Sequence, residues 1–150
     1  MLMQEKIQEE LKKSLKNKDE ATVSTLRLLI AAIKNFEISK GKAGYKANDE
    51  EIAGVIQKQV KQRKESIEQY KAGNRQDLVE KESRELEILE KYLPRQLSEE
   101  EVEQIVEKKI KEIGASSLGD IGKVMGILSN ELKGKADLGR VGKMVHDKLS

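Results

Sequence analysis

The chain contains 150 residues, of which 37% are hydrophobic and 37% are charged, and its formal net charge is +2. This near-neutral balance excludes a strongly basic nucleic-acid coat protein, and the absence of cysteine excludes disulfide bonds and thiolate chemistry. The N-terminus lacks the apolar run of a signal peptide, and no segment is apolar enough to span a membrane. We therefore expect a soluble cytoplasmic protein that does not act at a membrane.

Apolar residues recur at helical spacing and aromatic residues are few, so the sequence predicts an all-α fold. In the N-terminal part, cap residues separate the periodic stretches. Asp19 precedes the second stretch, Asn48 or Asp49 precedes the third, and Gln76 or Asp77 begins the fourth. These signals predict an N-terminal bundle of about four helices, over residues 2–15, 20–39, 49–72 and 76–93.

The second of these helices is the most apolar stretch of the chain and is expected at the centre of the bundle. It also carries Arg27, which in such a run is expected to extend to solvent or to pair with a carboxylate. The fourth helix has only a thin apolar stripe. Its glutamates alternate with Lys and Arg at i,i+3 and i,i+4 spacing, so they are expected on an exposed surface, Glu85 among them.

Pro94, the single proline, marks a joint in the chain. Proline lacks an N–H and disfavours a helical conformation in the residue before it, so one helix should end at Leu93. Ser98 and Glu101 then have the spacing of a capping box, which starts the next helix. The sequence predicts an N-terminal helical domain over residues 1–93, a hinge over 94–97 and a C-terminal domain over 98–150.

Three helices are expected after the joint. The first, over about residues 99–113, should be closed by Gly114; the second should end at Gly134; and Asp137 should cap the third. Six of the eleven glycines lie between positions 119 and 142, and those at 122, 126 and 142 fall inside predicted helices. Glycine there costs up to about 1 kcal/mol relative to alanine. Two short helices crossing closely at these glycines would explain them, as would a backbone that approaches a ligand, and the two explanations are compatible.

Recognisable catalytic motifs are absent from the sequence. One histidine, His146, and no cysteine leave no ligand set for a zinc ion. The chain has no Gly-x-Ser-x-Gly nucleophile and neither of the common glycine-rich nucleotide-binding motifs. We therefore expect no catalytic residues, no metal and no cofactor, and we interpret the chain as a two-part helical binding module.

The strongest local feature for binding is the glycine-flanked turn before the last helix. A helix start offers free N–H groups, and nearby Lys and Arg add positive charge, a combination that attracts phosphate. The predicted phosphate-binding residues, and so the candidate contacts to any nucleic acid, are Lys133, Gly134, Lys135, Gly139, Arg140 and Lys143. The alternative interpretation is a solvated surface turn without a ligand.

Several short motifs carry a resemblance to a known family over essentially the whole chain. They are Leu26-Arg27, Gln62-Arg63-Lys64-Glu65-Ser66, Tyr92-Leu93-Pro94, Gln96-Leu97-Ser98, Gly122-Lys123-Val124-Met125-Gly126, Gly134-Lys135-Ala136-Asp137 and Val141. Together they resemble YqeY proteins. The C-terminal motifs also resemble the tail of the B subunit of the tRNA-dependent Asp/Glu amidotransferase (GatB).

The resemblance implies a larger N-terminal helical domain followed by a small C-terminal three-helix domain. The tail of GatB engages tRNA, so the resemblance implies tRNA as a partner of the C-terminal domain. It also ties the chain to carbon–nitrogen ligases that use glutamine as amido donor. Nothing in the chain matches the catalytic part of GatB, so we expect a non-catalytic accessory protein. Two alternatives stay open: a protein–protein adaptor that docks on translation or amidotransferase machinery, and an enzyme with an unrecognised site.

Overall fold

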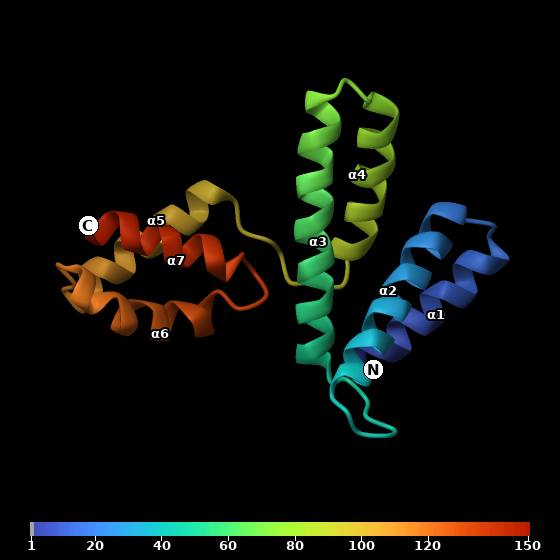
Figure 1. The fold of residues 1–150 in the computed structure, drawn as a ribbon, viewed down its shortest axis with the longest axis horizontal. Coiled ribbons are helices and arrows are strands. Elements are labelled where there is room, and N and C mark those ends of the chain that lie inside the picture. Colours follow the sequence, from blue (N-terminus) through green and yellow to red (C-terminus); the bar gives the residue numbers. More distant parts are fainter. Residues whose placement is uncertain (1) are drawn as a thin grey trace. The chain divides into compact units, whose positions relative to one another are not determined.

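The computed structural model describes residues 2–150, and this part of the chain is all-α, as predicted, with seven α-helices, one short 3-10 helix and no strand. The elements are α1 (Met3–Lys16), α2 (Glu20–Ser39), α3 (Asp49–Ala72), α4 (Gln76–Glu90), α5 (Glu99–Ile113), η1 (Leu118–Asp120), α6 (Ile121–Glu131) and α7 (Leu138–Leu149). Within residues 2–150, no helix combines the length and the apolar character needed to cross a bilayer. The elements group into two compact units, Met1–Leu93 and Pro94–Ser150 (Figure 1).

The predicted caps explain where the helices begin. The backbone N–H of Thr22 donates to Asp19 Oδ1 at 3.2 Å, and Asn48 Oδ1 accepts from the N–H three residues later at 2.8 Å, which decides between Asn48 and Asp49. The N–H of Glu101 donates to Ser98 Oγ at 3.2 Å, completing the predicted capping box. Each such bond satisfies an N–H that the helix itself cannot, and is typically worth about 1 kcal/mol.

The helix before the proline ends earlier than predicted. α4 stops at Glu90, and the chain continues through two i,i+3 bonds, from Tyr92 N to Leu89 O at 3.2 Å and from Leu93 N to Glu90 O at 3.1 Å. A proline ring clashes with the carbonyl four residues before it, which here belongs to Glu90. The influence of Pro94 therefore reaches back by a full turn, and the predicted helix end at Leu93 is three residues too late.

The first helix of the second unit closes as predicted, and an additional element follows it. Gly114 has a φ of +74°, which glycine adopts without steric cost, and its N–H donates to Ile110 O at 3.0 Å. The connector then forms η1, which the sequence did not predict. The Asp120 carboxylate accepts from the N–H groups of Ser116 and Ser117, at 2.9 and 3.3 Å, and this bonding holds the short turn.

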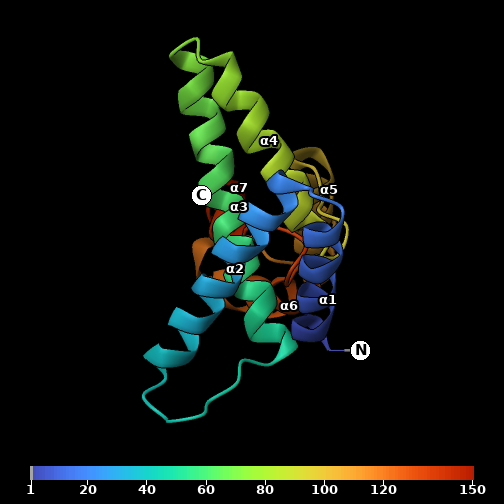
Figure 2. The ribbon, with the colours of Figure 1, turned by 90° about the vertical axis from the view of Figure 1, so that its right-hand side faces the viewer.

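In the first unit, α2 packs against α1, α3 and α4 and is the central helix, as expected. The buried side chains of this core include Ile7, Leu26, Leu29, Ile33, Ile52, Ile56 and Leu89. α3 and α4 form a long hairpin whose far end extends beyond α1 and α2 (Figures 1 and 2). There Ile67 and Val79 are buried outside the main core.

In the second unit, α5, α6 and α7 all pack on one another around a small aliphatic core. Its buried members are Val102, Val106, Val124, Leu128, Leu132, Ala136, Val141, Val145 and Leu149. Ion pairs link the helices outside this core: Lys109 Nζ lies 2.9 Å from Glu131 Oε1, and Lys148 Nζ lies 2.8 Å from Glu107 Oε1. These carboxylates raise the pKa of both lysines. Both cations are therefore engaged within the unit.

The close helix crossing predicted at the glycines is wrong for α6. A Cβ atom built on Gly122 or Gly126 would have no non-local heavy atom within 4 Å, and both residues are exposed. At Gly142 of α7 a Cβ would lie 3.8 Å from Met125 Cε, which is an ordinary van der Waals contact. The glycines of α6 face solvent because the core-facing positions are taken by Val124 and Leu128.

We expect Gly126→Ala to stabilise the second unit by about 0.5–1 kcal/mol, because alanine in a helix interior loses less backbone entropy and meets nothing here. Urea unfolding followed by circular dichroism measures the change. The matched control is Gly114→Ala, which we expect to destabilise because φ there is +74°. A destabilising Gly126→Ala would contradict the open environment of that position.

Candidate nucleic-acid interface

The turn between α6 and α7 is held by its own backbone and by buried residues. The N–H groups of Lys135 and Ala136 both donate to Leu132 O, at 2.9 and 3.2 Å, and the side chains of Leu132 and Ala136 are buried in the core. Gly134 has a φ of +78°. A Cβ atom there would lie 3.7 Å from Pro94 Cγ, so the backbone conformation, and not a lack of space, requires glycine.

The residues after the joint hold this turn from outside. Leu97 N donates to Lys135 O at 2.9 Å, and Gln96 Nε2 donates to the carbonyl oxygens of Gly134 at 2.7 Å and Pro94 at 2.9 Å. The stretch predicted as a hinge is thus bonded to the second unit. Gln96 was not among the residues predicted for the site. Its partner Gly134 is 38 residues away, and neither spacing nor periodicity indicates a contact over such a separation.

The start of α7 offers fewer free donors than predicted. The carboxylate of Asp137 accepts from Gly139 N at 3.0 Å, as a helix cap does. This bond occupies one of the N–H groups expected to face a phosphate, and it places a negative charge at the same helix end. The helix N-terminus alone therefore does not make an anion site, and attraction must come from the cations around it.

The four predicted cations are all exposed, but their surroundings differ. Arg140 Nη1 lies 3.7 Å from Glu99 Oε1, in a pair whose side chains are both 75% exposed, and such pairs contribute little to stability. Among the described residues, Lys135 and Lys143 have no ion-pair partner. Lys133 is exposed on the turn itself. The structure thus places the predicted residues on the turn and on the first two turns of α7, with Lys135 and Lys143 as the unpaired cations.

A second group of charged side chains lies inside the α3–α4 hairpin. Arg63 Nη1 donates to Glu82 Oε2 at 2.9 Å and also bonds the Glu85 carboxylate. Glu85 is only 6% exposed, so the prediction of an exposed surface position is wrong: this residue faces α3. Gln59 Oε1 and Arg63 Nε are buried without a partner among the described residues. Because one guanidinium binds both carboxylates, neither is a free base, and we interpret the cluster as structural.

A hollow of about 580 Å³ in the first unit lies between α1, α2 and α4. The buried residues Thr22 and Ile88 line it, together with lysines and glutamates. Burial, with a smaller contribution from the charge of Glu10, raises the pKa of Tyr92 to about 12, so its hydroxyl stays protonated at physiological pH. None of the predicted contact residues lies in this hollow.

Metal ligands do not gather in the part of the chain that the structure describes: no three or more His, Asp or Glu side chains are arranged to hold an ion. The single histidine, His146, is exposed on α7. Its Nδ1 lies 3.6 Å from Asp147 Oδ1 and 3.5 Å from Ser150 Oγ, close to the end of the helix.

Comparison with known protein families decides the identity of the chain. The family model described as Yqey-like protein matches residues 4–149, which includes both units. The chain belongs to the YqeY-like family. The family predicted from the short motifs is therefore confirmed, and the match covers the turn between α6 and α7 as well as the α3–α4 hairpin.

Similar proteins share the name "Altered inheritance of mitochondria protein 41, mitochondrial". That of Saccharomyces cerevisiae (strain S288c) is 40% identical over 103 residues, 66% of this YqeY-like chain and 54% of the relative. That of Pyrenophora tritici-repentis is 32% identical over 136 residues, 87% and 71% of the two chains. That of Lachancea thermotolerans is 38% identical over 87 residues, 58% and 46%. The YqeY-like chain thus spans about half the length of the yeast relatives it matches.

These names contradict the expectation of a cytoplasmic protein, because all three relatives are named as mitochondrial. The physical reason for the error lies in what composition can report. The expectation rested on the lack of cysteine and on the lack of long apolar segments. Neither property separates one aqueous compartment from another.

Proposed function

We propose that this YqeY-like protein is a non-catalytic accessory protein that binds structured RNA, foremost tRNA, through the turn between α6 and α7. The observation that carries the proposal is the pair of exposed, unpaired cations Lys135 and Lys143 beside a turn whose backbone is held by Gln96. Lysine contacts to phosphate require no particular base sequence. Recognition would follow the shape and charge of the RNA.

The resemblance of the second unit to the tail of GatB supports tRNA as the RNA concerned. It also supports a role beside carbon–nitrogen ligation with glutamine as amido donor, in which a partner enzyme carries out the chemistry and this chain holds the tRNA. The names of the relatives favour a mitochondrial location for that role.

The electrostatics of the turn favour moderate affinity. Asp137 lies at the start of α7 and Glu99 lies beside Arg140, so both carboxylates reduce the positive potential that the four cations produce. Phosphate neutralisation supplies most non-specific affinity for nucleic acids. We therefore expect binding that depends strongly on ionic strength and varies little between tRNA sequences.

The test is filter binding of bulk tRNA at several salt concentrations. Four phosphate contacts, each contributing about 0.7–0.9 units, predict a slope of about −3 in a plot of log K against log salt. Replacing Lys135 and Lys143 with alanine should flatten this slope by about 1.5 units and weaken all tRNAs by a similar factor. The fold should survive, because both side chains are exposed and lie outside the core.

The matched control removes the same charge elsewhere, by replacing the exposed lysines Lys12 and Lys64 of the first unit with alanine. This variant should keep the wild-type slope. If both double variants flatten the slope equally, the attraction depends on the net charge of the chain and not on the turn. If wild type does not bind bulk tRNA at about 50 mM salt, where phosphate contacts are strong, RNA binding is excluded and the adaptor function replaces it.

A further inference from the structure

The central helix of the first unit is apolar on a side that the unit leaves open. Helices that are apolar on all sides are usually buried on all sides. α2 is the most apolar helix of the first unit, yet one face of it is exposed. We define the outer face of α2 as the exposed residues Ser24, Leu28, Ala31, Asn35 and Ile38. In Figure 2 the ribbon of α2 passes in front of α3, and no other element of the first unit lies in front of the α2 ribbon in this view.

The large side chains of this face are unusually open to solvent. Leu28 is 54% exposed and Ile38 is 68% exposed. The five positions repeat with a 4–3 spacing, the period with which one helix packs along another. Unpartnered apolar surface of this kind indicates an interaction site. Because the row runs straight along α2, a second helix can cover it along its whole length.

A hollow adjoins the first turns of the outer face. It has a volume of about 390 Å³ and is lined by residues of both α1 and α2, among them Leu15, Val23 and Arg27. Leu15 itself is 48% exposed. A hollow of this size, with Leu15 and Val23 in its lining, can receive an apolar side chain. Such buried anchors carry most of the affinity of an interface.

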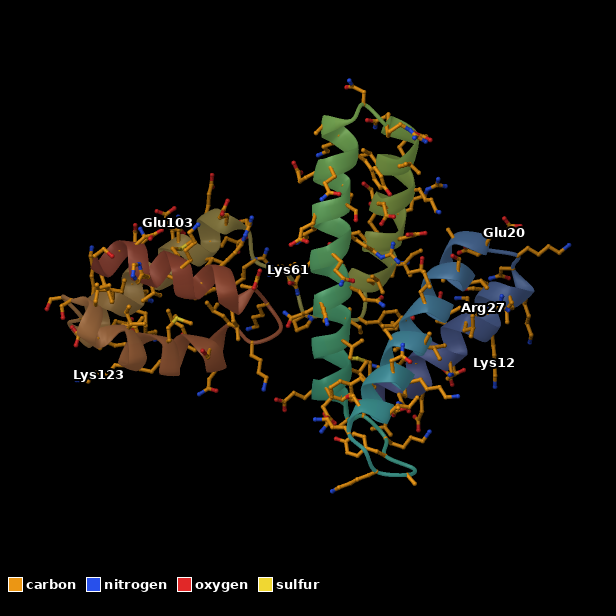
Figure 3. The ribbon with its side chains drawn as sticks, viewed as in Figure 1. Lys12, Glu20, Arg27, Lys61, Glu103 and Lys123 are labelled. Atoms are coloured by element: carbon orange, nitrogen blue, oxygen red, sulfur yellow. The ribbon has the colours of Figure 1, made fainter. Side chains whose placement is uncertain are left out.

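Charges along one edge of the face indicate the chemistry of the partner. Arg27 and Lys34 are seven residues, or about two helical turns, apart on the same edge of α2. Both are exposed, and neither has an ion-pair partner among the described residues. Lys18 lines the adjoining hollow, and Glu20 is the one acidic residue in its lining. Arg27 and Glu20 are labelled on the chain in Figure 3. Complementary charges on a partner would be carboxylates.

We infer that the outer face of α2 and the adjoining hollow bind an acidic amphipathic helix of a partner protein. Its apolar side lies along Leu28 and Ile38, and its carboxylates meet Arg27 and Lys34. A second copy of this chain fits less well, because its own Arg27 and Lys34 would be brought to the same seam. The inference concerns the first unit and does not depend on RNA binding by the second.

Two synthetic helical peptides of about 20 residues, long enough to hold helical structure, test this inference. Both carry leucines at the 4–3 spacing; one has glutamates beside the leucines and the other has lysines at the same positions. Each is labelled with a dye and titrated with the full chain, and fluorescence anisotropy measures binding. We expect the glutamate peptide to bind at least about tenfold more tightly than the lysine peptide, since like charges across an interface are unfavourable.

Two variants of the chain distinguish binding at the outer face of α2 from non-specific hydrophobic binding elsewhere on the chain. Leu28→Ser with Ile38→Ser should weaken the glutamate peptide by about tenfold or more, as loss of buried apolar anchors does. The matched control, Leu118→Ser with Ile127→Ser, changes similarly exposed residues of the second unit and should leave binding unchanged. Circular dichroism checks that each variant is folded.

A charge-reversed variant tests whether charge sets the preference between the two peptides, which apolar contacts alone cannot do. Arg27→Glu with Lys34→Glu should invert the preference, so that the lysine peptide binds more tightly. The inference is overturned if neither peptide binds, if the two bind equally, or if the control variant loses binding as well. It is also overturned if sedimentation equilibrium shows a dimer of wild type that Leu28→Ser with Ile38→Ser dissociates, because a second copy would then occupy the face.

Discussion

Arg63→Met should lower the free energy of unfolding of the first unit by about 3–5 kcal/mol, the usual effect of removing one partner from a buried charged cluster. The side chain of Arg63 is 12% exposed, and it bonds both Glu82 and Glu85. Without the guanidinium, the carboxylate of Glu85 would remain buried with no compensating charge. The cost comes from this unpaired carboxylate more than from the loss of an attractive pair.

Tyrosine fluorescence during urea unfolding measures this change, because Tyr45, Tyr70 and Tyr92 all lie in the first unit and the chain has no tryptophan. A combined variant, Arg63→Met with Glu82→Gln and Glu85→Leu, should recover most of the loss, since no unpaired charge then stays buried. The matched control is Lys64→Met at the exposed neighbouring position, with an effect within about 0.5 kcal/mol. A loss below about 1 kcal/mol for Arg63→Met would mean that water reaches the cluster.

Leu128→Ala should destabilise the second unit by about 2–5 kcal/mol, because it removes three buried carbon atoms and leaves a cavity. Leu128 is fully buried, in a core that consists of few residues. Domains with small cores have a small free energy of unfolding. The first unit should be unaffected if the two units fold independently, which the stop at Pro94 and the new cap at Ser98 predict.

The distribution of aromatic residues makes this independence measurable in one experiment. Tyrosine fluorescence reports the first unit alone, whereas far-UV circular dichroism reports the helices of both. For Leu128→Ala we expect an early transition by circular dichroism and an unchanged transition by fluorescence. Leu118→Ala, at a half-exposed position of the same unit, is the control with little expected effect. A fluorescence transition that shifts together with circular dichroism would show that the units unfold as one.

The sequence by itself determined those features that depend on neighbours along the chain. Asp19, Asn48 and Ser98 start helices because each side chain reaches an N–H only three residues away, and Gly114 ends a helix because of its own backbone freedom. The helix at residues 20–39 was predicted with its exact bounds for this reason. The family could also be predicted from the sequence, because each of its motifs is a short contiguous stretch.

The candidate site was predictable only in part. The positions of Lys135 on a glycine-flanked turn and of Lys143 on the helix that follows can be read from the sequence, since the two residues are close in the chain. The bond from Gln96 to Gly134 and the pairing of Arg140 with Glu99 join residues about 40 positions apart, so neither contact follows from spacing along the chain. The first holds the turn, and the second gives Arg140 an ion-pair partner.

Only the tertiary structure decided which side of each helix is covered. Helical periodicity shows that Glu85, Arg27 and Gly126 lie on particular faces, but it does not show whether another helix lies against those faces. Glu85 is buried because α3 supplies Arg63, whereas Arg27 and Gly126 are exposed because no helix of their own unit packs on them. Burial is a property of two elements at once, so the periodicity of one element cannot determine it.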